Sequence, residues 1–270
     1  MDFVKSCLCG MPITNPSEVT ALFEQKMKDP DFWNLGFFDE RQYCLNCLCG
    51  AMEAESNKLS ARLEEINGRN IEAYIKNNIF YKFPGCHQAK LTDFSDTVQH
   101  RANDLLTNGG DLLITGDTGV GKSYLGCAIA MHYMRQPFKT EVPFENRIFE
   151  CKKVNLMVRE VKDTFSDSNQ TETTQGDLFK RWSEQPRLFM DDFGAFNKTA
   201  FTLELLQDLL DARCGAVEKT TIFTTNLSLT EISNLFGDRI ASRIASSRLK
   251  LTLSGEDMRI KKVISQQSVV

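Results

Sequence analysis

Residues 109–123 read GGDLLITGDTGVGKS, a short apolar run that ends in a glycine-rich loop. The loop, GDTGVGKS at 116–123, fits the pattern G-x-x-x-x-G-K-[ST], with Gly116, Gly121, Lys122 and Ser123 at the fixed positions. Glycines let the backbone curl so that successive amides point at a phosphate, while the lysine adds a positive charge and the serine hydroxyl is a ligand for Mg²⁺. The stretch therefore predicts a strand, a phosphate-binding loop and a helix in succession.

This loop predicts a site for ATP and Mg²⁺. The apolar, helix-length stretch KSYLGCAIAMHYMRQ at 122–136 supplies the expected helix, whose amino terminus adds a dipole favourable to phosphate. We expect Ser123 to contribute to the magnesium site. The residues predicted to contact the nucleotide are Gly116, Asp117, Thr118, Gly119, Val120, Gly121, Lys122, Ser123 and Tyr124.

Two further apolar runs, RLFMDDFG at 187–194 and TTIFTTN at 220–226, are separated by the helical pattern at 199–217. Strands that alternate with helices predict an α/β fold whose parallel sheet is covered by helices on both faces. Sites in such folds lie at the carboxyl edge of the sheet. Polar residues at the ends of these runs are therefore candidate site residues.

The acidic pair at the end of the run RLFMDD supplies candidates for metal binding and water activation. We assign Asp191 to Mg²⁺ and Asp192 to the attacking water, because a hydrolysed magnesium nucleotide requires both functions. The alternative is that two aspartates only end a strand and begin a turn. Asn226 lies at the end of the next run, where its amide would reach the terminal phosphate or the water. As an alternative, Asn226 caps the following helix, although Ser228 is suited to that role.

Arg239 and Arg243 lie four residues apart in GDRIASRI at 237–244. This spacing places both arginines on one helical face, while Ile240 and Ile244 form the adjoining stripe that anchors the helix. Taken alone, the stretch predicts a solvated surface helix. The preceding phosphate loop and polar strand ends make the two arginines candidates for completing an active site.

The amino-terminal segment holds five of the nine cysteines, within its first 49 residues. Cys7 and Cys9 form C-x-C, and Cys44 and Cys47 form C-x-x-C. Four thiolates meet the tetrahedral preference of Zn²⁺, so we predict a zinc site at these four residues. Cys49 could replace Cys47 as a ligand, and a redox or chance cluster is the alternative interpretation. The other cysteines occur singly and are expected to be buried packing residues.

The composition indicates an ordinary globular protein of 270 residues with a formal charge of −4. No global positive field favours nucleic acid or an anionic membrane, so any such binding has to be local. No apolar run is long enough to span a membrane, and the start of the chain lacks a secretory signal, so a cytoplasmic protein is expected. We predict a small cysteine-rich domain with a helical connector at 1–75 and a nucleotide-binding domain at 76–270.

In order, the stretches GDTGVGKS, LFMDDFGAF, TTIFTTNLSLTEIS, GDRIASRI and SGEDMR resemble those of the AAA+ ATPases of the DnaC, DnaI and IstB group, more specifically the bacterial and phage replicative helicase loaders. The resemblance covers about residues 80–262. It implies a P-loop AAA+ domain without a carboxyl-terminal lid, in which Lys122 and Ser123 belong to Walker A. Asp191 and Asp192 then correspond to the Walker B acids and Asn226 to the sensor asparagine.

The same resemblance implies that Arg243, and with less support Arg239, reaches the γ-phosphate held by a neighbouring subunit. The second Walker B place usually holds glutamate, and the shorter aspartate suggests slow or partner-stimulated hydrolysis of ATP to ADP and phosphate. Arg259 in SGEDMR is either a sensing arginine or part of a basic tail. DnaI-like loaders carry a zinc-bearing domain that contacts the helicase, whereas IstB transposition ATPases generally have a helical one, so the cysteines favour a loader.

The expected function is therefore an ATP-dependent helicase loader that binds a replicative DNA helicase, self-associates through its AAA+ domain and places the helicase on single-stranded DNA. Local basic charge is compatible with DNA, because residues 239–262 hold seven basic and two acidic side chains. The helix at 154–167 offers Arg159 and Lys162, in a region that lines a pore for single-stranded DNA in the family. The alternatives are an IstB-like transposition ATPase and a nucleotide-controlled adaptor with little hydrolysis.

Overall fold

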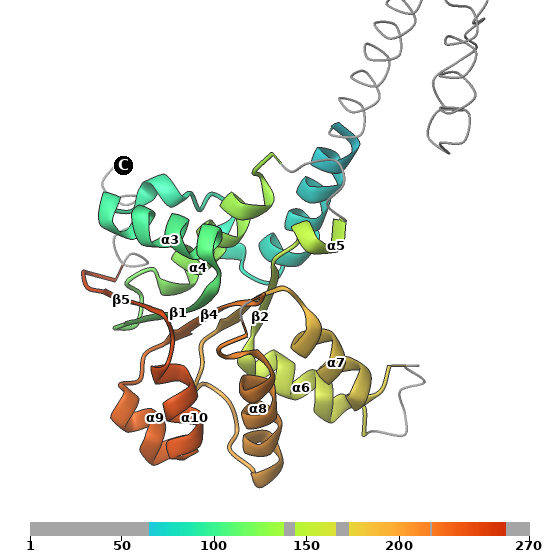
Figure 1. The fold of residues 1–270 in the computed structure, drawn as a ribbon, viewed down its shortest axis with the longest axis vertical. Coiled ribbons are helices and arrows are strands. Elements are labelled where there is room, and N and C mark those ends of the chain that lie inside the picture. The colour runs from blue at the N-terminus through green and yellow to red at the C-terminus, as the bar shows by residue number, and fades with distance from the viewer. Residues whose placement is uncertain (1–64, 138–143, 166–172, 217, 258–270) are drawn as a thin grey trace, which may run out of the picture. The chain divides into compact units, whose positions relative to one another are not determined.

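The computed structural model describes residues 65–137, 144–165, 173–216 and 218–257 (Figure 1). The chain divides into two compact units, 1–69 and 70–270. The predicted zinc ligands Cys7, Cys9, Cys44 and Cys47 lie outside the described residues, as does Arg259. The elements are η3 (Lys76–Phe80), η4 (Pro84–Cys86), η5 (Leu91–Asp93), α3 (Asp96–Asn108), β1 (Gly110–Gly116), α4 (Lys122–Met134), α5 (Phe144–Arg147), β2 (Glu150–Lys153), α6 (Val154–Asp163), α7 (Gln175–Glu184), β3 (Arg187–Asp191), α8 (Ala200–Arg213), β4 (Thr220–Thr225), α9 (Leu229–Phe236), α10 (Asp238–Ala245) and β5 (Leu249–Leu253).

The second unit is built on a five-stranded parallel sheet with the order β2-β3-β4-β1-β5. Within the register, Leu112 of β1 lies opposite Ile222 of β4 and Leu249 of β5. The predicted α/β fold with a parallel sheet is confirmed. All three strands predicted from apolar runs are present, and β2 and β5 complete the sheet at its edges.

Alternate residues of each central strand enter two different cores. Leu112 of β1 and Phe189 of β3 pack in one hydrophobic cluster, whereas Leu113 and Met190 pack in the other. Side chains of a strand alternate between its faces, so both faces of the sheet are buried. Figure 1 shows α3 and α4 on one side of the sheet and α6 to α10 on the other.

The helix that follows the phosphate loop approaches the sheet closely at Gly126. A Cβ atom at this position would lie 2.2 Å from the ring of Phe189, which is fully buried in β3. Glycine is therefore required for α4 to lie this close to the sheet. The contact fixes the amino terminus of α4 over the carboxyl edge, where the phosphate loop ends.

Arg213, the last residue of α8, is completely buried. Its Nη1 atom donates to the carbonyl oxygens of Trp182 and Gln185, each at 2.6 Å, and its Nη2 atom donates to that of Thr220 at 3.2 Å. Burial lowers the pKa of Arg213 to about 10, so the guanidinium stays charged at neutral pH. Arg213 thereby connects the end of α8 to the carboxyl end of α7 and to the start of β4.

Three of the four single cysteines are buried as predicted, Cys86, Cys127 and Cys151, whereas Cys214 is only half-buried. Their pKa values follow the same environment, since burial raises the pKa of Cys127 and of Cys151 well above the ordinary thiol value. Across the described parts of the chain, none of the helices has the length and apolar character needed to cross a bilayer.

Candidate nucleotide-binding site

A pocket of about 690 Å³ lies at the carboxyl edge of the sheet. It brings together the phosphate loop, the strand ends of β2, β3 and β4, and the short helix η4. The lining residues are Phe83, Pro84, Gly85, Cys86, Thr118, Gly119, Gly121, Lys122, Ser123, Tyr124, Lys153, Asp191, Asp192, Thr224 and Asn226. Sequence segments more than 100 residues apart thus meet in one site, as parallel strand topology predicts.

Glycines set the curvature of the phosphate loop. Gly116 has φ 141°, and a Cβ atom there would lie 2.2 Å from the carbonyl oxygen of Leu253. Gly121 adopts the left-handed region with φ 100° and is the N-cap residue of α4. Gly121 has no side chain with which to cap the helix, so it leaves the first amides of α4 facing the loop, as at an anion site.

Lys122 is folded along the loop that precedes it. Its Nζ atom donates to the carbonyl oxygen of Gly116 at 2.8 Å and to that of Asp117 at 2.6 Å. The side chain is buried against the loop while it lines the pocket. Tyr124, two residues further along α4, donates its hydroxyl to Asp93 at 2.8 Å, and the surrounding burial raises its pKa to about 12.

The hydroxyl of Thr224 joins the two adjacent aspartates at the end of β3. It donates to Oδ1 of Asp191 at 2.7 Å and accepts the backbone N–H of Asp192 at 2.9 Å. Asp191 is buried, whereas Asp192 is exposed in the same pocket. Asp192 has φ 59°, a left-handed conformation that no other described non-glycine residue adopts. This backbone turn sends two consecutive carboxylates to different environments.

Burial raises the pKa of Asp191 above the ordinary aspartate value. Hydrogen bonds from Thr224 and from Ser123 oppose this effect by favouring the ionised form. A carboxylate that is desolvated and faces a serine hydroxyl is suited to binding a cation, which would restore the lost solvation.

Asn226 is exposed at the pocket, directly beyond β4. The helix α9 is capped by Ser228, whose hydroxyl accepts the N–H of Glu231 at 3.2 Å within a complete capping box. Thr225, the last residue of β4, donates its hydroxyl to the carbonyl oxygen of Phe193 at 2.6 Å. The capping alternative for Asn226 is therefore wrong, and its amide remains available to the pocket.

Arg239 and Arg243 lie on α10, outside this pocket. As expected from their spacing, Ile240 and Ile244 are buried and fix the helix to the core. Both guanidiniums reach Asp211 of α8, at 2.6 Å each. Their side chains keep 63% and 45% exposure, so both heads are available to another molecule.

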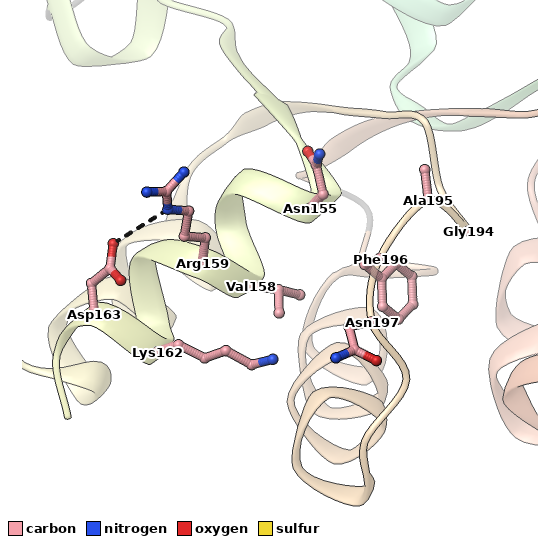
Figure 2. Close-up of a pocket in the computed structure, with 9 residues that line it drawn as sticks. All are labelled: Asn155, Val158, Arg159, Lys162, Asp163, Gly194, Ala195, Phe196 and Asn197. Atoms are coloured by element: carbon pink, nitrogen blue, oxygen red, sulfur yellow. Dashed lines mark ion pairs between the residues drawn. The ribbon is translucent and has the colours of Figure 1, made fainter. Parts of the chain in front are cut away.

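A second pocket of about 510 Å³ lies between α6 and the loop after β3. Figure 2 shows the side chain of Lys162 extending toward Asn197, whereas Arg159 turns back toward Asp163. The ion pair between Arg159 and Asp163 is long, at 3.9 Å, and exposed. The pocket therefore presents positive charge next to the half-buried ring of Phe196.

Sequence reasoning missed three residues of this region. Thr224 was read only as part of an apolar strand end, although a threonine before a polar residue at that edge was a usable signal. Lys153 ends β2, a strand whose short and polar sequence ECKK gave no apolar signal. Asp211 has no local signal in the sequence, because its partners Arg239 and Arg243 are 28 and 32 residues away.

The pocket residues fit a magnesium nucleotide: the helix amino terminus and Lys122 suit phosphate, and Ser123 with Asp191 supplies oxygen ligands. Together with the order of the strands, these features define a P-loop domain of the AAA+ class. The chain belongs to the family of IstB-like ATP binding proteins, whose match covers residues 86–265. It is thus an AAA+ ATP-binding protein of the DnaC and IstB type.

Solved structures share this fold at low sequence identity. A DNA replication initiation factor is 13% identical, with a TM-score of 0.52 over 67% of this chain and 54% of that one. AMPPCP-bound DnaA from Aquifex aeolicus is 14% identical, with a TM-score of 0.50 over 67% and 55%. The DnaC helicase loader is 19% identical, with a TM-score of 0.49 over 62% and 98%. No curated protein matches the chain at the level of sequence.

Proposed function

We propose that the protein hydrolyses ATP to ADP and phosphate in a pocket that a neighbouring subunit completes. The observation that carries this proposal is the separation of the arginine pair from the pocket of its own chain. In the pocket, Lys122 and the amides at the start of α4 hold phosphate. Ser123 and Asp191 hold Mg²⁺, which when bound neutralises charge on the phosphates.

Asp192 is the residue we assign to the attacking water. Its exposed carboxylate takes a proton from water held by Asn226, which directly follows the adjacent strand β4. The aspartate side chain is one methylene shorter than that of glutamate. The attacking water therefore lies farther from the carboxylate, or is less well aligned with it, than it would be with glutamate. The consequence is slow hydrolysis in the isolated chain.

Arg243, assisted by Arg239, is the group that we assign to the phosphate of the adjacent subunit. A guanidinium with free donors stabilises the charge that develops on the transferred phosphoryl group. Burial of Ile240 and Ile244 holds α10 rigidly, so that the arginines are presented at a fixed position. Self-association is then a requirement for full activity.

A complementation experiment tests this arrangement. Lys122→Ala should abolish nucleotide binding, and Arg243→Ala should bind ATP but lose the turnover that rises with protein concentration. A mixture of the two variants should recover turnover, because an intact pocket in one subunit meets an intact arginine in the other. Undiminished turnover by Arg243→Ala at every concentration, or no recovery in the mixture, would remove the proposal.

We further propose that this ATPase is a helicase loader acting with a replicative DNA helicase and single-stranded DNA. The predicted zinc ligands Cys7, Cys9, Cys44 and Cys47 support a helicase-binding module, and the positive second pocket supports contact with a DNA strand. Full-length protein should retain the host's replicative helicase in a pull-down. The double variant Cys44→Ser, Cys47→Ser should lose both zinc and the helicase.

The family description keeps a transposition ATPase as the second candidate, because the chain matches IstB-like ATP binding proteins. Capture of a transposase encoded beside this protein, with no capture of the helicase, would favour that function.

An adaptor that only binds ATP is the third candidate, and undetectable turnover in the presence of DNA and partner would favour it. Lys162→Ala should weaken binding to a single-stranded oligonucleotide in either ATPase role.

A further inference from the structure

Lys153 is a second lysine in the nucleotide pocket, and it comes from a different strand than Lys122. It is the last residue of β2 and the N-cap residue of α6. Its Cα atom lies in register with that of Asp191 on β3. Two regular elements therefore fix the backbone of Lys153 beside the acidic strand end.

The ammonium of Lys153 has an unusual environment for a half-buried charge. It lies 5.6 Å from the centre of the Phe83 ring, which packs along the pocket wall. No hydrogen bond or ion pair to this ammonium occurs within the described part of the chain. It does act on Asp191 through space, favouring the ionised carboxylate. A cation without a direct counter-ion in such a pocket is arranged to receive an anion.

The order of the strands indicates which part of a nucleotide Lys153 would meet. Along the carboxyl edge, the phosphate loop follows β1, Asn226 follows β4, the aspartates end β3, and Lys153 ends β2. The phosphates start from the loop and extend toward Asp191. In that direction the terminal phosphate would be the one nearest to β2, where it would otherwise face the carboxylates of Asp191 and Asp192.

We propose that Lys153 is a phosphate-binding residue that contacts the terminal phosphate of ATP within the same subunit. This inference rests on the proposed nucleotide function and adds a residue that distinguishes ATP from ADP. In the unassembled chain Lys153 offsets the repulsion between the terminal phosphate and the two aspartates. On assembly, Arg239 and Arg243 of a neighbouring subunit add their positive charge to that of Lys153.

The test compares binding of ADP with that of AMPPCP, an ATP analogue resistant to hydrolysis, by equilibrium dialysis of the full chain in MgCl₂. Lys153→Met keeps the aliphatic stem over Phe83 and removes the charge. We expect AMPPCP affinity to fall at least about tenfold and ADP affinity to change less than about twofold, as for the loss of one charged hydrogen bond. Lys153→Arg should restore most of the preference for AMPPCP.

Lys198→Met is the matched control, because its ammonium lies 5.5 Å from the Phe236 ring, outside the pocket. It should bind both nucleotides as the wild type does, and thermal unfolding should show all variants folded. If Lys153→Met weakened the binding of ADP and AMPPCP equally, or weakened neither, the assignment of Lys153 would be overturned and the proposed ATPase function would not be affected. Wild-type protein that binds neither nucleotide would overturn the proposed function and this inference together.

Discussion

Asp211 on α8 holds Arg243 of α10 by the Nε atom. Its Oδ1 atom accepts from Arg243 Nε at 2.6 Å, and its Oδ2 atom accepts from Arg239 Nη2 at 2.6 Å. The two terminal nitrogens of Arg243 make no hydrogen bond within the described residues. The bond to Arg243, together with the charge of both arginines, holds the pKa of Asp211 below its ordinary value. Asp211 thus remains ionised and directs the free end of Arg243 away from α8.

Replacing Asp211 with asparagine should therefore slow hydrolysis without affecting nucleotide binding. The neutral amide loses one charged acceptor, so Arg243 is oriented less well for the neighbouring phosphate. We expect kcat of the assembled protein to fall about three- to tenfold, with AMPPCP affinity unchanged. Asp104→Asn is the control, because Asp104 pairs with Arg248 at 2.8 Å outside the site. Equal loss in both variants would indicate a general effect of surface charge.

Thr224→Val should impair the acidic strand end while conserving side-chain volume. The variant removes the donor to the buried carboxylate of Asp191 and the acceptor for the N–H of Asp192, so two polar groups lose a partner. The loss of that donor raises the pKa of Asp191 further, so the acid limb of the pH–rate profile should move to higher pH. We expect a fall of about tenfold or more in turnover at pH 7.

The control for this variant is Thr252→Val, which removes an exposed hydroxyl bond to Thr115 at 3.0 Å. Its turnover and pH profile should match those of the wild type. A Thr224→Val protein with an unshifted acid limb would show that the hydroxyl serves packing and not the carboxylate.

Asp191→Asn should stabilise the nucleotide-free protein near neutral pH. Because burial raises the pKa of Asp191, the ionised carboxylate is less favourable in the folded than in the unfolded chain. Its contribution to stability is full below the ordinary aspartate pKa and is lost as pH rises through the raised value. Asparagine carries no charge at any of these pH values, so it does not lose stability in this way. The Tm of the Asp191→Asn protein at pH 7 should therefore exceed that of the wild type by about 2–4 °C.

Calorimetry at a series of pH values from neutral down to the ordinary aspartate pKa tests this sign. The difference in Tm should shrink as the pH falls, because Asp191 of the wild type becomes protonated. Asp192→Asn is the control: the residue is exposed, and asparagine tolerates its left-handed backbone. A wild-type protein more stable than Asp191→Asn at pH 7 would contradict the role of burial.

Local patterns with strong physical causes were predictable from the sequence. The phosphate loop and the strands β1, β3 and β4 are continuous apolar or glycine-rich runs, so their type and order followed from short-range rules. The capping role of Ser228 and the anchoring by Ile240 and Ile244 were also readable, since capping and helical spacing are local. The edge strands β2 and β5 escaped prediction because ECKK and LKLTL are short and charged.

Contacts between distant segments were beyond sequence reasoning. The bond between Asp211 and Arg243 depends on how α8 and α10 pack, and the place of Lys153 depends on which strand neighbours β3. Composition and spacing carry no information about such pairings. The predicted zinc ligands lie outside the described residues and stay a prediction, as does the domain boundary at residue 75.

Gly126→Ala should destabilise the fold although alanine is the better helix former. Helix propensity favours alanine by about 1 kcal/mol, but its Cβ atom would lie 2.2 Å from the Phe189 ring, which is fully buried and cannot move away. Overpacking of this kind costs about 1–3 kcal/mol, so we expect a net loss of about 1 kcal/mol, and at most about 2 kcal/mol, in the free energy of unfolding, measured with urea. The matched control is Gly176→Ala in α7, where the nearest atom, Oγ1 of Thr174, is 3.6 Å from the added Cβ. That variant should be as stable as the wild type or slightly more so. Stabilisation by both substitutions would show that α4 can shift from the sheet, and the phosphate loop would then be less rigidly placed than this contact implies.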